Sequence, residues 1–259
     1  MIELVHIHKE YDATGRGSSA TIAVDDVSLT LENGQFTVVV GRSGCGKTTL
    51  LNLIAGFELP TSGEVLLDGK PVHGPGSERL VVFQQPVLYP WLDVRHNVSI
   101  GLRMSQGRRK VDWKRVAELI EIMGLDGFEN HYPHQLSGGM QQRAAIARSL
   151  ILNPSVLLMD EPFGALDAQT RTAMQDFLLN LWNDLRATVL FVTHDVEEAI
   201  LLGDRVVVMT PRPGKIASVV DVRLARPRSI DVSLTDEFLE IKREVLASLH
   251  TVPRQEVRS

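Results

Sequence analysis

The sequence predicts an α/β fold with a mainly parallel sheet at its core. From residue 36 onward, short apolar runs rich in β-branched residues alternate with segments of helical periodicity. A glycine-rich stretch at residues 41–49 joins the apolar run at 36–40 to an apolar helix that stops at Gly56. Strands that alternate with helices form parallel sheets covered by helices.

The strands are predicted first. They lie at residues 2–7, 22–31, 36–40, 63–67, 80–83, 156–159, 188–192, 205–210 and 215–222. Residues 12–19 read as a loop. Residues 1–85 and 154–225 are assigned to the sheet-based core, 86–153 to an inserted helical subdomain and 226–259 to a helical tail.

Helical periodicity is seen in the inserted subdomain and again within the sheet-based core. In the inserted region Trp113, Val116, Ala117, Ile120 and Met123 are predicted to share one apolar face. A further amphipathic helix is predicted around residues 174–185. All of these segments together make one large domain with a subdomain, which suits a chain of 259 residues.

Bulk properties exclude several classes. The net charge of −5 gives no indication of nucleic-acid binding. Cys45 is the single cysteine, so no disulfide forms within the chain, which suits a reducing compartment. No signal-peptide pattern is present, and no apolar stretch approaches the roughly 18 residues of a membrane span. Any membrane role is therefore expected to be peripheral.

The stretch at 41–49 fits the phosphate-binding pattern G-x-x-x-x-G-K-[ST]. It consists of Gly41, Arg42, Ser43, Gly44, Cys45, Gly46, Lys47, Thr48 and Thr49. Glycines let backbone N–H groups turn toward a phosphate chain, and the helix N-terminus adds a positive dipole end. Lys47 is expected to reach the β- and γ-phosphates and Thr48 to ligate Mg²⁺. The alternative is a glycine-rich turn before a core helix.

Cys45 lies inside this stretch at a helix N-terminus, where thiol pKa values are lowered. Alkylation is therefore expected to inactivate the protein, and Mg·ATP to protect it.

Two further constellations carry chemistry. Asp160 and Glu161 follow an apolar strand. At that edge of a sheet, Asp160 suits the ligand shell of Mg²⁺, and Glu161 suits a base that activates water. The alternative is that both are solvated acids at a strand end.

Ser137 is predicted to cap a helix that starts with Gly138 and Gly139. This pattern indicates either a second anion-binding helix N-terminus or an ordinary capped helix.

Together, the phosphate loop, the octet Leu-Ser-Gly-Gly-Met-Gln-Gln-Arg at 136–143 and Asp160-Glu161-Pro162 resemble the ATP-binding cassette (ABC) ATPases. The octet is diagnostic of that family. The resemblance implies a P-loop NTPase core with an N-terminal antiparallel β subdomain and an inserted helical subdomain. It also implies a head-to-tail homodimer that binds ATP and Mg²⁺. The signature residues expected to contact the ATP of the partner chain are Leu136, Ser137, Gly138, Gly139 and Gln141.

The resemblance implies further roles. Tyr11 matches the aromatic that stacks on adenine, although it is also a plausible strand-end tyrosine. Gln84, adjacent to Gln85, matches the Q-loop residue that contacts Mg²⁺ or water. Asp167 matches the D-loop at the dimer interface and also suits a helix N-cap. His194 matches the switch histidine that contacts the γ-phosphate. The alternative is a histidine with a structural role only.

The expected catalytic set is Lys47, Gln84, Glu161 and His194, and the expected Mg²⁺ ligands are Thr48, Gln84 and Asp160. Catalysis would consist of positioning and charge neutralisation.

The cargo is addressed only by resemblance. Leu-Tyr-Pro-Trp at 88–91, residues 160–167 and residues 212–216 are similar to the nitrate, sulfonate and taurine importer branch, with the taurine-type subunit as the closest match. This implies membrane permease subunits, a periplasmic or extracellular solute-binding protein and a location on the cytoplasmic face of the inner membrane.

Trp91 is either an exposed permease anchor or a core residue. Alkanesulfonate, nitrate or another small solute are the alternative cargoes. A non-transport ABC ATPase of DNA or ribosomes and a P-loop kinase fit less well, because long coiled coils, a second cassette and an acceptor site are not evident.

Overall fold

The computed structural model describes residues 1–12, 20–185 and 187–250. The predicted loop at 12–19 from residue 13 on, and the predicted tail from residue 251 on, lie outside the described residues. The chain divides into two compact units. The sheet unit comprises residues 1–75 and the chain from Gln175 on, and the helical unit comprises Gly76–Met174. The predicted helical subdomain at 86–153 lies inside the helical unit, which also contains two strands.

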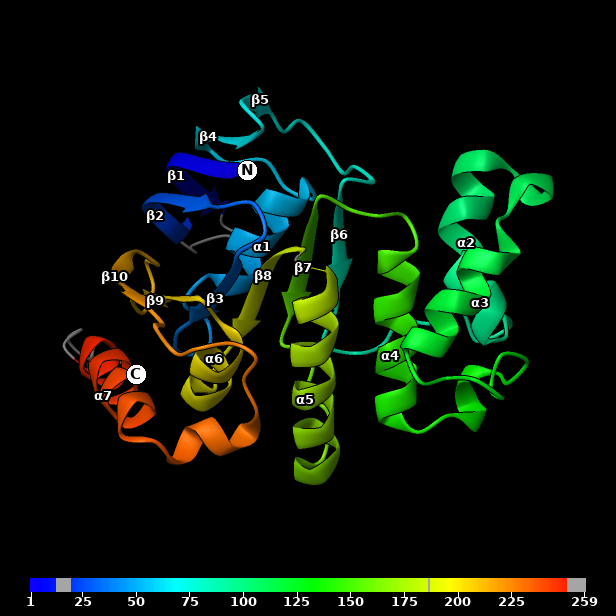
Figure 1. Cartoon of the computed structure of the whole chain (residues 1–259). Coiled ribbons are helices and arrows are strands. Elements are labelled where there is room, and N and C mark those ends of the chain that lie inside the picture. The colour runs from blue at the N-terminus through cyan, green and yellow to red at the C-terminus, as the bar shows by residue number, and fades with distance from the viewer. Residues whose placement is uncertain (13–19, 186, 251–259) are drawn as a thin grey trace. The chain divides into compact units, whose positions relative to one another are not determined.

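The N-terminal part of the sheet unit is an antiparallel sheet of order β2-β1-β4-β5 (Figure 1). Its strands are β1 (Ile2–Tyr11), β2 (Thr21–Leu31), β4 (Ser62–Leu67) and β5 (Lys70–Pro71). β1 pairs antiparallel with both β2 and β4. The inward positions of β1 are Ile2, Leu4 and Ile7, and the register shift between Leu4 and Ile7 keeps the third of them facing inward.

A second sheet of this unit contains β10 (Ile216–Asp221), β9 (Arg205–Met209), β3 (Phe36–Val40) and β8 (Thr188–Thr193), in that order. β3 is parallel to β8 and to β9, and β10 is antiparallel to β9. Every residue of β3 and β8 is buried. Strands covered on both faces read as unbroken apolar runs, which explains the pattern seen in the sequence. The predicted antiparallel subdomain and the mainly parallel core are both confirmed.

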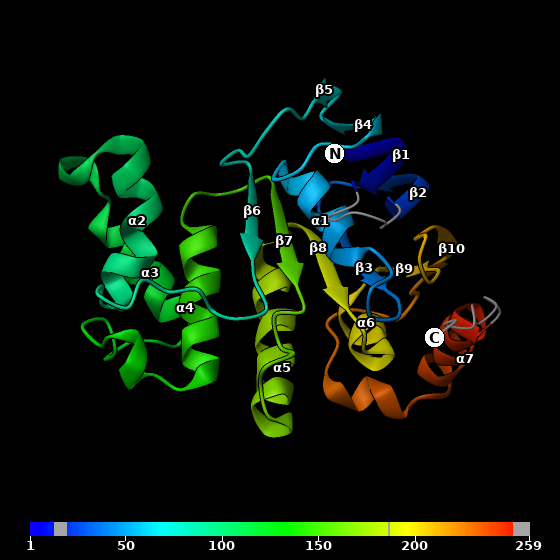
Figure 2. The same ribbon diagram turned by 180° about the vertical axis from the view of Figure 1, so that it is seen from behind.

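Helices cover the second sheet. α1 (Lys47–Ala55) contacts β2 and β8, so it packs between the two sheets of this unit (Figure 2). It ends at Gly56, whose φ of 77° and N–H bonds to Asn52 and Leu53 close the helix. α6 (Val196–Leu202) contacts β3, β8 and β9, and α7 (Asp236–His250) contacts α6, β9 and β10. α5 (Ala168–Leu185) begins in the helical unit and ends in the sheet unit.

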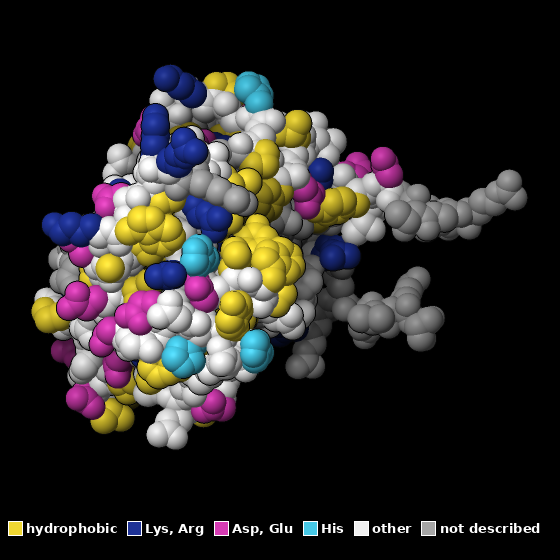
Figure 3. Space-filling model, turned by 90° about the vertical axis from the view of Figure 1, so that its right-hand side faces the viewer, with side chains coloured by type: hydrophobic (Ala, Val, Ile, Leu, Met, Phe, Trp, Pro, Cys, Tyr) yellow, Lys and Arg dark blue, Asp and Glu magenta, His cyan; other side chains and the backbone are white. Residues whose placement is uncertain are grey.

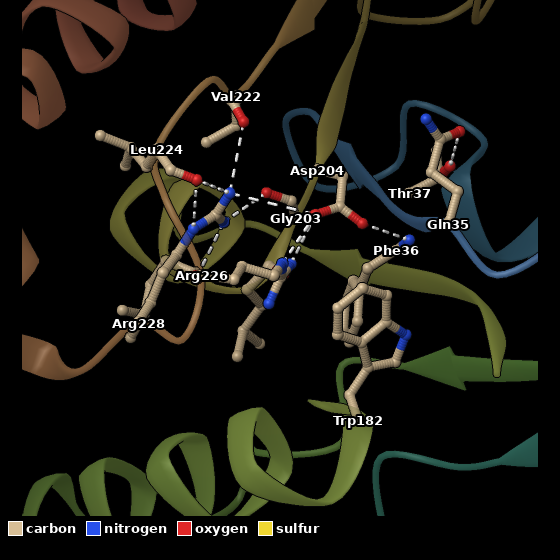
Figure 4. A network of polar contacts seen from close by, with 12 residues as sticks. Gln35, Phe36, Thr37, Trp182, Gly203, Asp204, Val222, Leu224, Arg226 and Arg228 are labelled. Atoms are coloured by element: carbon tan, nitrogen blue, oxygen red, sulfur yellow. Dashed lines mark hydrogen bonds and ion pairs between the residues drawn. The ribbon is translucent and has the colours of Figure 1, made fainter. Parts of the chain in front are cut away.

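Two arginines fasten the C-terminal segment to the end of α6 (Figure 4). The Arg226 guanidinium pairs with Asp204, donates to the Leu202 carbonyl and lies 4.1 Å from the centroid of the Trp182 ring. Arg228 donates to the carbonyls of Ile200, Leu201 and Gly203 and to those of Val222 and Leu224. The short helix η3 (Ile230–Leu234) and α7 follow from this anchor.

The helical unit contains the parallel pair β6 (Arg79–Val82) and β7 (Val156–Asp160). Its helices are α2 (Val94–Gln106), α3 (Trp113–Ile122) and α4 (Gly138–Leu150), with the short turns η1 (Arg108–Lys110) and η2 (Pro133–Gln135). α2 contacts both α3 and α4, and α3 also contacts α4.

The buried face of α3 is narrower than the sequence predicts. Val116, Ile120 and Met123 are buried as expected, whereas Trp113 and Ala117 are exposed. The Trp113 ring instead forms a T-shaped pair with the His96 ring, with the two centroids 5.6 Å apart. Within the described ranges, no helix combines the length and apolar character that crossing a bilayer requires.

Candidate functional site

The phosphate-binding loop lies between β3 and α1 in the sheet unit. Gly44 and Gly46 have φ values of 76° and 99°, a left-handed conformation that favours glycine. Arg42, Ser43, Gly44 and Thr48 are exposed, so the loop presents its backbone and two hydroxyl residues to solvent. This is the geometry expected of an anion cradle at a helix N-terminus, and it disfavours the alternative of a simple turn.

Lys47 is held inside the loop. Its residue is 5% exposed, and its Nζ donates to the carbonyls of Gly41 at 2.9 Å and Arg42 at 3.3 Å. The ammonium group therefore lies among the backbone atoms of the loop itself.

Cys45 has no accessible thiol. The residue is 1% exposed, and its Sγ would lie 2.6 Å from a Cβ placed on Gly41. This burial argues against ready alkylation of the thiol, although alkylation itself stays a prediction. Its backbone remains part of the loop.

The strand that precedes His194 is a neighbour of the strand that precedes the loop. Val40 of β3 pairs in register with Thr193 of β8. Because the two strands are parallel, Gly41 and His194 leave the sheet at the same edge. His194 is exposed there, directly before the N-cap Asp195 of α6. An exposed position at the ligand-binding edge argues against a core histidine.

Tyr11 ends β1 and is tied down by polar contacts. Its hydroxyl donates to Glu58 at 2.6 Å and lies 3.4 Å from the hydroxyl of Thr49, in the phosphate loop. Burial and the hydrogen bond with Glu58 raise the pKa of Tyr11. Lys9 pairs with Glu58 and has its Nζ 5.0 Å from the centroid of the Tyr11 ring. The sequence did not single out Glu58, since an acid after a helix end carries no motif.

In the helical unit, the carboxyl ends of β6 and β7 bring three predicted residues to one edge. Val82 pairs in register with Met159, so Gln84 and Asp160 follow neighbouring strands. Glu161 has φ of 43°, an uncommon backbone conformation for a glutamate. A Cβ placed on Gly164 would lie 3.0 Å from the Nε2 of Gln84 and 3.3 Å from the backbone oxygen of Glu161, so the Gln84 amide group lies near the segment that follows β7. Gln84 and Gln85 are both exposed, and the role of Gln84 stays a prediction.

The signature segment forms the start of α4. The Ser137 hydroxyl accepts from the Met140 N–H at 3.3 Å, as an N-cap does. Ser137 and Gly138 are exposed, whereas Leu136 and Gly139 are buried. A Cβ on Gly139 would lie 2.9 Å from Thr170, so this glycine also allows close packing against α5.

Gln141 supports the signature loop from within. Its Nε2 donates to the carbonyls of Pro133 at 3.0 Å and Leu136 at 3.2 Å. The side-chain amide group thereby links α4 to the turn that precedes it.

Asp167 caps α5. Its carboxylate accepts from the N–H of Thr170 at 3.0 Å and from the Thr170 hydroxyl at 2.7 Å. These hydrogen bonds lower the pKa of Asp167. The predicted capping role is confirmed, and the exposed carboxylate leaves an interface role open as a proposal.

A groove of about 340 Å³ lies on the helical unit, lined by residues of β6, α2 and α4. Tyr89 forms one wall, and its ring centroid lies 5.5 Å from that of Trp91. Trp91 is 70% exposed, which excludes the core alternative for it. Figure 3 shows hydrophobic side chains gathered among histidines and acidic residues on one face of the molecule.

Arg148 lies in the same groove and was not found from the sequence. Its Nη1 donates to the Val87 carbonyl at 2.5 Å, and its guanidinium lies 5.8 Å from the centroid of the Tyr89 ring. Burial lowers the pKa of Arg148. Arginines are common in the last turn of a helix because they interact favourably with the helix dipole. The sequence therefore gave no indication that Arg148 lines a groove.

The oxygen donors of the two strand edges suit Mg²⁺. This ion prefers carboxylate and hydroxyl oxygens and retains several waters. The Thr48 hydroxyl is exposed at the start of α1, and the Asp160 carboxylate is half-buried at the end of β7. Thr48 in the sheet unit and Asp160 in the helical unit therefore each offer an oxygen ligand of the kind that Mg²⁺ prefers.

Comparison with known proteins agrees with this geometry. The family model described as "ABC transporter" matches residues 24–164. A taurine import ATP-binding protein of Pelagibacter ubique is 48% identical over 88% of this chain and 87% of its own length. An aliphatic sulfonates import ATP-binding protein of Bacillus cereus is 45% identical over 86% of each chain.

Among solved structures, a dimeric, post-hydrolysis ATP-binding cassette bound to ADP and Pi covers 87% of this chain and 100% of its own, with a TM-score of 0.73 and 33% identity. With the phosphate loop, the signature helix and the strand-end carboxylates in place, the chain belongs to the ABC transporter family, as an ATP-binding subunit that hydrolyses ATP to drive transport.

Proposed function

We propose that this chain powers the import of taurine through a membrane permease, with alkanesulfonates as the closest alternative cargo. The groove beside Tyr89 and Trp91 is the observation that supports docking on a permease, because a subunit that only hydrolysed ATP would not need exposed aromatic side chains there. The names of the similar import proteins support the cargo class.

ATP is expected to bind between two copies of the chain. In one copy the loop residues Gly41–Thr49 would hold the phosphates, with Tyr11 against the adenine. In the other, Ser137 and Gly138, which are exposed at the N-terminus of α4, would contact the same nucleotide. The dimeric state of the similar cassette bound to ADP and Pi supports this arrangement.

Hydrolysis is expected to use residues from both strand edges. Lys47 would neutralise the phosphates, Glu161 would accept a proton from the attacking water, and His194 would orient the γ-phosphate. Thr48, Gln84 and Asp160 would be the ligands of Mg²⁺, which would supply charge neutralisation. Replacement of Glu161 by glutamine should keep ATP binding and trap the closed dimer. Sedimentation of Glu161→Gln with ATP tests this, and a monomer under those conditions would contradict the role of Glu161.

The permease is expected to insert a helix into the groove. Tyr89 and Trp91 supply apolar contact, and the Arg148 guanidinium supplies a charged donor within it. Permease docking would place the chain at the cytoplasmic face of the inner membrane, as a peripheral subunit. A periplasmic or extracellular solute-binding protein would deliver the cargo to the permease.

The test combines uptake with ATPase activity. Cells that lack this chain should lose taurine uptake, and wild type but not Lys47→Ala should restore it. Trp91→Ala should abolish uptake while the isolated subunit keeps its ATPase activity. Trp113→Ala, which changes another exposed tryptophan of the same unit, serves as the matched control.

Parallel uptake assays with alkanesulfonates, nitrate and sulfate separate the cargoes. If uptake of another anion is lost instead of taurine uptake, the chain powers an importer for that anion. Normal uptake of every tested solute in cells lacking the chain would contradict the proposed cargo class.

A further inference from the structure

Glu198 is a buried carboxylate that no motif in the sequence accounts for. It lies on α6, one turn after His194, and its residue is 5% exposed. Burying a carboxylate is costly unless hydrogen bonds compensate for the lost water. The partners of this carboxylate therefore indicate what it is retained for.

Two side chains donate to the Glu198 carboxylate. The Thr193 hydroxyl donates to Oε2 at 2.5 Å, and the Gln175 amide donates to Oε1 at 3.0 Å. Thr193 is the last residue of β8, and Gln175 belongs to α5. The carboxylate thus joins the strand that leads to His194 with the part of α5 that belongs to the same unit.

The direction of the Thr193 hydrogen bond is determined by its second contact. The same hydroxyl oxygen accepts from the Asp195 N–H at 3.1 Å. A hydroxyl group has one proton, so that proton points to Glu198 while the oxygen receives the backbone N–H. Glu198 therefore orients the group that holds the backbone of Asp195.

His194 lies between the two residues that this network holds. Thr193 precedes it and Asp195 follows it. Asp195 also accepts from the N–H groups of Glu197 and Glu198, at 2.9 and 3.2 Å, as the N-cap of α6. Both peptide neighbours of His194 are thus fixed by hydrogen bonds that lead back to Glu198.

We propose that Glu198 is a positioning residue for His194, acting through the Thr193 hydroxyl and the first turn of α6. The inference rests on the proposed role of His194 in hydrolysis. It assigns Glu198 no contact with the nucleotide. Small displacements of a catalytic group are enough to slow a reaction about 100-fold, so a support of this kind affects the rate.

Replacement of the carboxylate should lower the turnover rate and leave ATP binding intact. Glu198→Ala is expected to reduce kcat by about 10- to 100-fold, with KM for ATP within about twofold of wild type. Glu198→Gln should stay within about threefold of wild-type kcat, because its oxygen still accepts from Thr193 and the Gln175 amide group can rotate to accept from the new N–H groups. Glu197→Ala, which changes the exposed neighbour, is the matched control and should retain wild-type kcat.

Thr193 provides an independent variant in case Glu198→Ala does not fold. Thr193→Val keeps the shape and removes the hydroxyl, so it should reproduce the fall in kcat. Thr193→Ser restores the hydroxyl and should restore the rate. Wild-type kcat in Thr193→Val or in folded Glu198→Ala would overturn the proposal.

The deciding experiment places Glu198→Ala in a His194→Ala background and measures kcat for ATP. If Glu198 acts through His194, the second substitution should change kcat by less than about twofold. The same 10- to 100-fold loss in both backgrounds would overturn the proposal. His194→Ala alone reports on the proposed function: unchanged kcat there would overturn the role of His194, and with it the need to position that residue.

Discussion

Replacing Arg228 by methionine should destabilise the chain strongly, because this guanidinium joins five backbone carbonyl groups (Figure 4). Its side chain is 1% exposed, and its donors reach the carbonyls of residues 200, 201, 203, 222 and 224 at 2.6–3.3 Å. Three of these carbonyls lie at the C-terminal end of α6, where helix carbonyls lack partners within the helix. Methionine fills much of the volume and leaves these acceptors without that donor.

The magnitude follows from two opposing contributions. Hydrogen bonds from a charged donor contribute about 1.5 kcal/mol each at the low end, or roughly 7–8 kcal/mol for the five carbonyls. Burial and the charge of Arg226 lower the pKa of Arg228 to about 10, and a shift of that size corresponds to a penalty of about 3 kcal/mol on the charged form. The difference is about 4 kcal/mol, which agrees with the 3–5 kcal/mol typical of a broken buried charge network.

Equilibrium urea unfolding and thermal melting measure this loss. A decrease of about 4 kcal/mol corresponds to a fall in Tm of roughly 8–16 °C for a chain of this size. Arg228→Lys should lie between wild type and Arg228→Met, because lysine keeps the charge and offers three donors instead of a planar fork. Arg223→Met, which removes an exposed arginine of the same segment, should change stability by less than about 0.5 kcal/mol. A free energy of unfolding for Arg228→Met within about 1 kcal/mol of wild type would contradict a stabilising role of this guanidinium.

The pKa shift also predicts the sign of a pH effect. Because the folded pKa lies below the unfolded value, the unfolded chain binds more protons than the folded chain above about pH 10. The contribution of Arg228 to stability should therefore rise with pH in that window and be constant below it. Arg228→Met should lack this increase.

Three other outcomes are expected. Burial and the Asp231 carboxylate raise the pKa of Asp176, so Asp176→Asn should stabilise the chain slightly at pH 7. In urea unfolding, this gain should fade as the pH falls through the raised pKa, and a gain that persists at pH 2 would contradict the cause. The buried Cys45 thiol should react with a maleimide at least tenfold more slowly than in urea-unfolded chain, and equal rates would show that the thiol is accessible. Gly56→Ala should lower the free energy of unfolding by about 3 kcal/mol or more, because its Cβ would lie 2.2 Å from a backbone oxygen. Gly69 also has a left-handed backbone but faces open space, so Gly69→Ala should lower it by about 1 kcal/mol. Similar Tm values for the two variants would rule out the clash.

Local patterns predicted the elements and the motifs well. The apolar run at 36–40 became β3, and the run at 188–192 became part of β8, because strands buried on both faces need continuous apolar residues. The N-cap roles of Ser137 and Asp167 were also predictable, since capping depends on residues only three positions apart.

Burial was harder to predict from the sequence. Trp113 and Ala117 fit the periodicity of α3 but are exposed, because periodicity identifies a face without showing how much of it a neighbouring helix covers. Cys45 has the sequence context of a reactive thiol and is nonetheless buried. Trp91 could equally have been core, and only the folded chain shows it exposed.

Family membership and the strand–loop–helix motif could be predicted from the sequence alone, because the phosphate loop, the signature octet and the Asp160-Glu161 pair are local patterns whose spacing carries their chemistry. Three supporting contacts became apparent only in the folded chain: Glu58 accepts from Tyr11, Glu198 accepts from Thr193, and Arg228 donates to the carbonyls at the end of α6. These pairs join segments whose contact depends on packing and on the need to satisfy buried polar groups. No local pattern encodes that requirement, since it arises only when the chain has folded.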